Sequence, residues 1–405
     1  MRILIVSNLF PPAARGGYEL ECGRVAEHLA LTHEVLVLTS STHRRAIPAE
    51  AHVRRELPFL AHDAAGAARA PAAALAGARA ARRALAWRPD LVYAWNGASI
   101  PHAVLRVLAD SQTPLAFRVC EHWFGGLFVR DQFMRELLPA RRGAGRRLWA
   151  AGCRAFDRLP SLRLVPDAPL RAALSWNSLA LRRAVATPPF AEVVLEQILH
   201  PAPPHGEAFE SVPRATAAEP EIAFLGRVTA YKGLEVAIEA LALLRADGHP
   251  AARLVVIGPE EPGYGAQMRR LASARGVAEA ISWRGQLDPE RSAAALSRAH
   301  ALIVPSLWEE PFGLVAIEGA LARVPVVAAD VGGIAEGLRP EEHALLFPRG
   351  DAAAAAGALR RVLEDSSGTD ARVARARLRA EDFRLGPYLQ AQERFVLDAA
   401  RALAR

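Results

Sequence analysis

The 405-residue chain contains almost no lysine, although basic side chains are plentiful. Lys232 is its only lysine, and the other 49 of its 50 basic residues are arginine. An ammonium group is a compact point charge with rotatable donors that suits phosphate oxygens, whereas a guanidinium is a planar fork. The pattern favours a chemical role for Lys232 over the alternative of an ordinary surface lysine.

Cysteine is also scarce, and long apolar runs are missing. The three cysteines, Cys22, Cys120 and Cys153, are odd in number and form no C-x-x-C pair, which is typical of reduced thiols in a cytoplasmic protein. No apolar run reaches the ~20 residues that span a bilayer, and a strand is expected from Arg2, which leaves no room for a signal peptide. We therefore expect a cytoplasmic protein.

Acidic side chains are in deficit only in the first half. Residues 1–213 contain 26 arginines and 18 acidic residues, whereas residues 214–405 contain 24 basic and 25 acidic residues. A basic half suits an anionic partner, such as a phosphorylated acceptor, an acidic membrane surface or nucleic acid; the alternative is an over-charged soluble surface. Because basic and aromatic residues are not interleaved along a stripe, we expect no nucleic-acid partner.

Short apolar runs alternate with helical runs throughout the chain. The expected strands are 2–7, 34–40, 90–95, 114–120 and 162–165 in the first half, and 221–226, 252–258, 280–285, 301–305 and 325–330 in the second. This alternation predicts two doubly wound, Rossmann-like α/β domains with parallel sheets. We expect them at 1–200 and 221–385, with a linker at 201–220 and a last helix at 386–405.

Ligands of open parallel sheets bind beyond the carboxyl ends of the strands, so the cleft between two such domains is the expected site. Arg227 and Lys232 follow the strand at 221–226, and two cations there fit a phosphate group. They do not form a Walker A loop, because Lys232 precedes a glycine instead of following one.

Two carboxylates follow the strand at 301–305. Pro311 is expected in the first turn of the next helix, which puts Glu310 at the start of that helix. Glu318 lies in the apolar stretch "GLVAIEGALA", where a carboxylate is costly unless it is hydrogen-bonded, for example by a ribose diol. The alternatives are a helix-end charge for Glu310 and a buried arginine pair for Glu318.

Glycine pairs follow two other strands. Gly16 and Gly17 open a helix whose backbone N–H groups suit an anion, and Gly332 and Gly333 precede Glu336 at a similar turn. Ordinary βα turns are the alternative for both. The chain lacks a G-x-G-x-x-G fingerprint, so a dinucleotide site is not expected.

Three motifs in the second half resemble the donor-binding domain of the nucleotide-sugar glycosyltransferases of family four. They are "GRVTAYKG" (226–233), "EPFGLVAIE" (310–318) and "GGIAE" (332–336), and "SNLFPPAARGGYE" (7–19) resembles the first domain of that family. The resemblance implies the GT-B fold, in which two Rossmann-like domains face a cleft and a C-terminal helix crosses back to the first domain. It also implies retention of anomeric configuration without a metal or other cofactor, in agreement with the absence of an Asp-x-Asp motif.

The resemblance also implies roles for these residues. Arg227 and Lys232 would hold the donor diphosphate and stabilise the leaving group, Glu318 would bind the ribose, and Glu310 would contact the donor sugar. The further donor-binding residues are Gly16, Gly17, Phe312, Gly313, Leu314, Gly332 and Gly333. The donor would be a nucleoside-diphosphate hexose, with UDP favoured. The acceptor would be a hydroxyl of a small molecule, a glycan or a lipid-linked molecule.

The acceptor side departs from the family pattern. The family commonly places a histidine, often followed by an aspartate, after the strand that corresponds to 114–120, but Cys120 and Glu121 occupy those positions here. Either a shifted loop lets His122 act catalytically on the sugar, or the role passes to Glu121 or to no side chain. Trp123 either lines the acceptor or belongs to the core.

A basic segment at 141–158 has two interpretations. As a helix it either docks on an anionic inner-membrane surface, where lipid-linked acceptors lie, or packs its apolar face on the first domain. Two rival functions also stay open: a nucleotide-sugar epimerase of the same fold, and a sugar-nucleotide binder without chemistry. A phosphorylase is disfavoured, because its pyridoxal cofactor would require Lys232.

Overall fold

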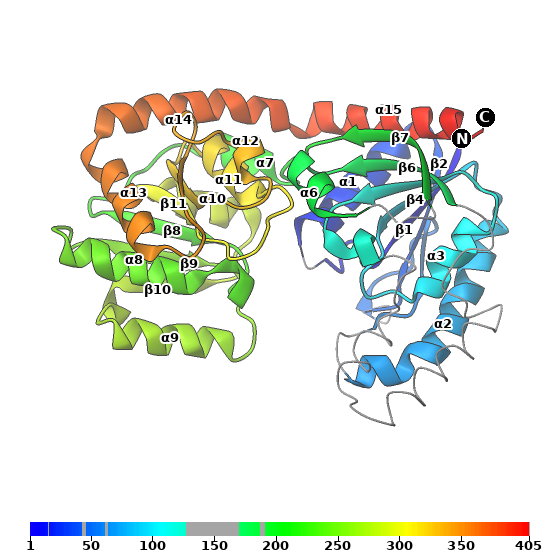
Figure 1. Cartoon of the computed structure of the whole chain (residues 1–405), viewed down its shortest axis with the longest axis horizontal. Helices are drawn as coiled ribbons and strands as arrows, with labels where there is room; N and C mark the ends of the chain where they lie inside the picture. The colour runs from blue at the N-terminus through cyan, green and yellow to red at the C-terminus, as the bar shows by residue number, and fades with distance from the viewer. Residues whose placement is uncertain (15, 43–45, 61–63, 127–169, 187–190, 405) are drawn as a thin grey trace. The chain divides into compact units, whose positions relative to one another are not determined.

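The structure is a computed structural model, and it describes residues 1–14, 16–42, 46–60, 64–126, 170–186 and 191–404. The expected strand at 162–165, the basic segment at 141–158 and Cys153 lie outside the described residues. The chain forms two compact units (Figure 1). The first unit comprises Met1–Asn177, Arg182–Leu199 and Leu389–Arg405, and the second comprises Ser178–Leu181 and His200–Tyr388.

The first unit contains a seven-stranded parallel sheet in the order β3-β2-β1-β4-β5-β6-β7. Its strands are β1 Arg2–Ser7, β2 Glu34–Ser40, β3 Val53–Leu57, β4 Leu91–Asn96, β5 Leu115–Val119, β6 Leu170–Trp176 and β7 Ala191–Ile198. The helices in its described residues are α1 Gly17–Leu29, α2 Ala64–Leu85, α3 His102–Ala109 and the short η2 His122–Gly126. The helix α6 Leu179–Ala184 and the last helix, α15 Leu385–Leu403, each begin in the second unit and continue in the first.

The second unit contains a six-stranded parallel sheet in the order β10-β9-β8-β11-β12-β13. Its strands are β8 Glu221–Leu225, β9 Arg253–Ile257, β10 Ile281–Gly285, β11 Ala301–Val304, β12 Val326–Ala329 and β13 Leu345–Phe347. Its helices are α7 Gly206–Ser211, α8 Leu234–Ala246, α9 Tyr264–Ala274, α10 Pro289–Ser297, α11 Leu314–Leu321, α12 Ile334–Gly337, α13 Ala352–Glu364 and α14 Ser366–Ala380. The short helices η3 Ala230–Lys232, η4 Ala278–Ala280 and η5 Glu381–Phe383 complete it.

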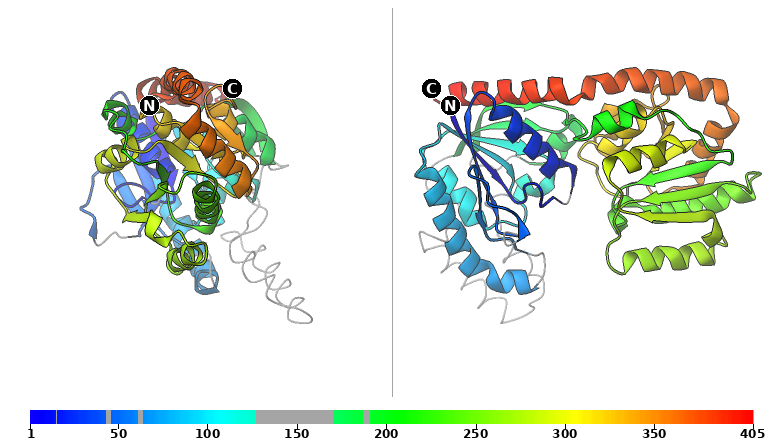
Figure 2. Two further views of the ribbon diagram at one scale, coloured as in Figure 1. Left: turned by 90° about the vertical axis from the view of Figure 1, so that its left-hand side faces the viewer. Right: turned by 180° about the vertical axis from the view of Figure 1, so that it is seen from behind.

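Helices cover these sheets because their apolar residues recur on one face. In α1, Cys22, Val25, Ala26 and Leu29 are all buried and follow the i, i+3, i+4, i+7 pattern of a helix that packs on a sheet. Full burial of a side chain such as Val25 or Leu29 stabilises the fold by about 1.5–3 kcal/mol. In the second unit α8 and α13, far apart in sequence, pack side by side (Figures 1 and 2).

The last helix and the segment before β8 both contact residues that are distant in the sequence. From Leu389 onward α15 belongs to the first unit, where Gln392 accepts a hydrogen bond from the Tyr93 hydroxyl at 2.5 Å. Residues 201–220, the expected linker, include α7 and lie within the second unit, with Phe209 buried in its core. None of the helices in the described part of the chain is long and apolar enough to cross a membrane.

Each sheet has one point at which the chain reverses its direction of travel across the strands. In the first unit this switch point lies between β1 and β4, and in the second it lies between β8 and β11. Loops that leave such a pair of strands diverge and leave a crevice at the carboxyl edge, where ligands bind. We therefore expect ligand-binding residues at these two places.

Candidate functional site

The loops after β8 and β11 approach each other backbone to backbone. Gly233 has a φ of 71°, and a Cβ atom there would lie 2.0 Å from the carbonyl oxygen of Pro305. The Leu307 amide donates to the Tyr231 carbonyl at 2.9 Å across the same gap. Only glycine fits at position 233, and it brings Lys232 to the loop that carries Glu310.

Lys232 and Glu310 meet at this switch point. The Lys232 Nζ lies 2.6 Å from Glu310 Oε1, and the Ser306 hydroxyl donates to the same oxygen at 2.5 Å. The Glu310 residue is only 4% exposed, so its charge requires these partners. In the described part of the chain no group bonds to Glu310 Oε2. The pair therefore leaves one carboxylate oxygen for a ligand hydroxyl.

The expected place of Pro311 is wrong. The helix α11 begins at Leu314 after Gly313, whose φ is 85°, so Glu310, Pro311 and Phe312 belong to the preceding loop. This loop has to bring Glu310 next to Ser306, and a helix that began at Pro311 would carry the carboxylate away from it. The Phe312 ring is buried and stacks on His200, with ring centroids 5.0 Å apart. Its side chain is therefore a core element and does not line the site.

The side chain of Glu318 on α11 has no hydrogen-bond or ion-pair partner among the described residues. Burial raises the pKa of its carboxyl group to about 8, and the positive charge of Lys232 opposes that rise. Among the described residues no donor hydrogen-bonds to it and no arginine pairs with it. The arginine pair considered from the sequence is thus not formed here. A carboxyl group that lacks a partner beside Lys232 is free to accept hydroxyl donors from a ligand.

The glycine pair at 332–333 is engaged within the protein. The Gly332 amide donates to Glu309 Oε2 at 2.8 Å, and the Gly333 amide donates to the Glu310 carbonyl at 2.8 Å. A Cβ atom on Gly332, whose φ is 55°, would lie 2.1 Å from that same carbonyl oxygen. These amides were expected to hold the sugar or the phosphate. In this structure they brace the loop that carries Glu310.

Glu336, the last residue of the third motif, accepts hydrogen bonds from the amides of Leu179 and Ala180 at 2.8 and 2.5 Å. These amides belong to the first turn of α6, where a carboxylate is favoured by the helix dipole. The glutamate therefore has a structural partner within the second unit.

In the first unit the glycine pair has a similar internal role. The Gly16 amide, just before α1, donates to Glu19 Oε2 at 2.7 Å, and Gly17 is the first residue of the helix. The anion cradle expected at this helix start is therefore partly filled by the protein's own carboxylate.

The acceptor-side candidates separate into surface and core residues. The Glu121 carboxylate accepts from Asn96 at 2.9 Å and from the Tyr18 hydroxyl at 3.5 Å, at the switch point between β1 and β4. His122 is exposed at the start of η2. The Cys120 thiol is buried, which raises its pKa, so it does not face a ligand. The Trp123 ring packs against Phe117 and Phe124, with centroids 6.5 and 5.7 Å away.

The sequence interpretation missed a buried ion pair in the first unit. The Arg118 guanidinium on β5 lies 3.1 Å from Glu21 on α1, and both side chains are fully buried. Burial raises the pKa of Glu21 to about 7, and Arg118 opposes that rise. The available signal was an arginine inside the apolar run "PLAFRVC".

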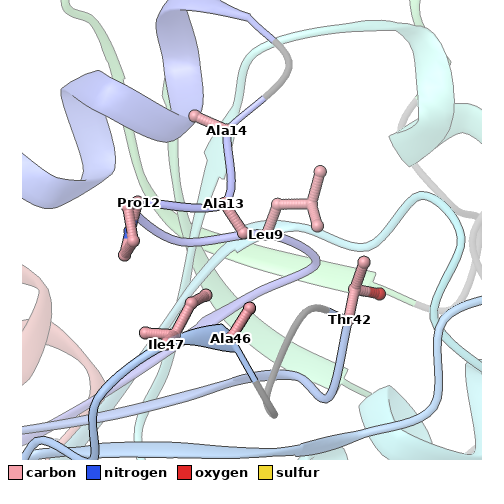
Figure 3. A pocket seen from close by; sticks show the side chains of 7 residues that line it. All are labelled: Leu9, Pro12, Ala13, Ala14, Thr42, Ala46 and Ile47. Carbon is pink, nitrogen blue, oxygen red and sulfur yellow. The ribbon is translucent and has the colours of Figure 1, made fainter.

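A cavity of about 270 Å³ lies beside the loop after β1 (Figure 3). Its lining residues are Leu9, Pro12, Ala13, Ala14, Thr42, Ala46 and Ile47. This lining is mostly apolar and contains none of the candidate residues, so the cavity is separate from the polar clusters.

Residues 208–379 match the family model described as Glycosyl transferases group 1. This match lies within the second unit. A D-inositol 3-phosphate glycosyltransferase of Nocardia farcinica is 37% identical over 152 residues, which are 36% of this chain and 33% of that protein. A glycogen synthase of Mycobacterium tuberculosis is 36% identical over 166 residues, 40% of this chain and 38% of that protein. The match thus spans 33–38% of the length of these relatives.

Solved structures match both units. The sucrose-phosphate synthase of Thermosynechococcus elongatus has a TM-score of 0.71 at 22% identity and covers 99% of each chain. The Anabaena protein HepE in complex with UDP has a TM-score of 0.66 at 19% identity and covers 98% of this chain and 100% of that one. This likeness confirms the predicted fold class, two Rossmann-like units as in GT-B glycosyltransferases.

Proposed function

We propose that this chain is a retaining glycosyltransferase that moves a hexose from a nucleoside-diphosphate sugar, with UDP favoured, to a hydroxyl of an acceptor. The observation that carries the proposal is the cluster of Lys232, Ser306 and Glu310 at the switch point of the group 1 domain, 2.5–2.6 Å apart. One oxygen of Glu310 and the carboxyl group of Glu318 lack partners among the described residues. A diphosphate requires cations, and the hydroxyls of the ribose and of the transferred sugar require hydrogen-bond acceptors.

The proposed roles follow from charge. Lys232 and Arg227 stabilise the negative charge that grows on the diphosphate as the bond between the anomeric carbon and the phosphate oxygen breaks. Glu310 Oε2 accepts a hydroxyl of the transferred sugar, and Glu318 accepts the ribose diol. The acceptor oxygen then bonds to the anomeric carbon on the face the diphosphate leaves, and a leaving phosphate oxygen takes the acceptor proton.

For the acceptor we propose that the first unit supplies the contacts. A group of relatives is named for D-inositol 3-phosphate and others for glycogen, which supports a small-molecule or glycan hydroxyl, and a lipid-linked acceptor is a further proposal. Glu121 is held in place by Asn96 and Tyr18, whereas His122 is exposed. Assays of His122→Ala and Glu121→Gln side by side decide which of the two residues contributes to transfer. The variant that removes the contributing side chain should lose more than about threefold in kcat/KM.

The test of the function is a donor panel. The purified chain is incubated with UDP-, GDP- and dTDP-hexoses and a set of polyol and glycan acceptors, and nucleotide release and product are measured. The proposal expects acceptor-dependent release from one donor, and proton NMR of the new glycoside should show the donor's anomeric configuration. Inversion would contradict the retaining mechanism, interconversion of the donor sugars would indicate an epimerase, and binding without turnover would indicate a binder.

A further inference from the structure

Tyr231 lies beside both cations of the second unit's switch point. The Cζ atom of Arg227 is 5.4 Å from the centroid of the Tyr231 ring, and the Lys232 Nζ is 5.9 Å from the same centroid. The Trp308 ring lies 5.2 Å from the Tyr231 ring at an interplanar angle of 61° and 5.7 Å from Lys232 Nζ. One tyrosine ring therefore contacts the two side chains that the proposed function places on the diphosphate.

The ring matters most for Arg227. Its side chain is exposed, and among the described residues no carboxylate pairs with the guanidinium and no group accepts a hydrogen bond from it. Lys232, in contrast, also has Glu310 at 2.6 Å. An arginine on a flexible stem loses rotamer entropy when a ligand fixes it, so a contact that fixes it beforehand improves binding. Within the described structure that contact is the Tyr231 ring.

The backbone holds the ring in place. Tyr231 is the middle residue of η3, in which the Lys232 amide donates to the Thr229 carbonyl at 3.0 Å. The Tyr231 carbonyl accepts from Leu307 at 2.9 Å, which ties this turn to the loop after β11. The backbone of Tyr231 is thus fixed by hydrogen bonds in the loops that follow β8 and β11.

We infer that Tyr231 is a positioning residue that holds Arg227 and Lys232 ready for the donor diphosphate; the inference rests on the proposed function. The face of an aromatic ring carries negative charge density and attracts both cations, while the two cations repel each other. Without the ring, Arg227 would turn away into solvent until a ligand recruited it. The hydroxyl of Tyr231 plays no part in this role.

The experiment compares Tyr231→Leu with Tyr231→Phe. Binding of UDP and of uridine, which lacks phosphate, is measured by isothermal titration calorimetry for both variants and the wild-type protein. We expect Tyr231→Leu to weaken UDP binding roughly tenfold, and Tyr231→Phe to stay within about twofold of wild type. Uridine binding and the melting temperature should not change. A purely structural role would instead weaken UDP and uridine together and lower the melting temperature.

A double-mutant cycle tests whether Tyr231 acts on UDP binding through Arg227. In an Arg227→Gln background the effect of Tyr231→Leu should shrink, because the ring then has one cation less to position. Equal UDP affinity in wild type and Tyr231→Leu, or an unchanged effect in the Arg227→Gln background, overturns the inference. If Tyr231→Leu does not fold, Tyr231→Met carries the same test. A wild-type protein that binds none of UDP, GDP and dTDP overturns the proposed function itself.

Discussion

Lys232 and Glu310 form an ion pair that is largely withdrawn from solvent. The Lys232 side chain is 22% exposed and that of Glu310 5%, and they lie 2.6 Å apart. Removing one partner of such a pair leaves the other charge without compensation, which costs more than removing both. A variant at this site therefore changes stability as well as chemistry, and the two effects have to be separated.

For this reason Lys232→Met is best compared with the double variant Lys232→Met/Glu310→Gln. We expect the single variant to lower kcat by roughly a hundredfold or more, as loss of a preorganised donor does, and also to lower the melting temperature. The double variant should regain melting temperature but not activity. Arg291→Met on α10, whose side chain is 77% exposed, serves as the control. A single variant with normal kcat would contradict the role of Lys232.

Glu318 makes stability depend on pH. Its pKa is about 8 in the folded protein against 4.5 as the reference, so the unfolded chain releases this proton at lower pH than the folded one does. The neutral carboxyl group makes its full contribution to the free energy of unfolding below pH 4.5, and that contribution is lost as the pH rises towards 8. Calorimetry of Glu318→Gln, which cannot ionise, should show a melting temperature that rises relative to wild type between pH 5 and pH 8. Melting temperatures of the two proteins that change in parallel with pH would contradict the raised pKa of the Glu318 carboxyl group.

Among the elements, strand β5 and helix α1 are joined by Arg118 and Glu21. Both side chains are fully buried, so Arg118→Met should destabilise the first unit by about 3–5 kcal/mol, because it removes the guanidinium that faces the buried Glu21 carboxylate. The double variant Arg118→Met/Glu21→Leu removes both charges and should recover much of that loss in urea denaturation. A single variant as stable as the double one would mean that the pair is not needed.

The sequence predicts most of the strands that are apolar runs. Strands such as β1 and β11 are continuous apolar runs and were placed correctly. The strand β3, "VRREL", alternates buried and half-buried residues and contains two arginines, and the sheet-edge strand β7 carries two glutamates. Both were missed, because pairing with a neighbouring strand decides their conformation more than their composition does. The buried strand β6 and the three-residue strand β13 were also missed.

The candidate site was predictable where a residue type is unusual for its place, and not where only geometry decides. A single lysine and a carboxylate in an apolar helix pointed to Lys232 and Glu318. The pairing of Lys232 with Glu310, the engagement of the Gly332 amide by Glu309, and the burial of Phe312 depend on how two loops meet after β8 and β11. No spacing in the sequence encodes those contacts.

At the level of the whole molecule, we propose that the chain needs no metal, because Arg227 and Lys232 supply the positive charge a metal would bring. Sugar transfer should survive excess EDTA with unchanged kcat, and added Mg²⁺ or Mn²⁺ should not raise it. Loss of activity in EDTA that either cation restores would show that the diphosphate is held in another way.

The central claim is that a nucleoside-diphosphate sugar binds at the switch point of the second unit through Lys232. The most direct test titrates UDP, GDP and dTDP into the wild-type protein and into Lys232→Met by isothermal titration calorimetry. We predict that one nucleotide binds the wild-type protein with one site per chain, and that the variant binds it at least about tenfold more weakly, as expected for a charge-assisted contact. Equal affinity in the two proteins, or binding of none of the three nucleotides, would contradict the claim.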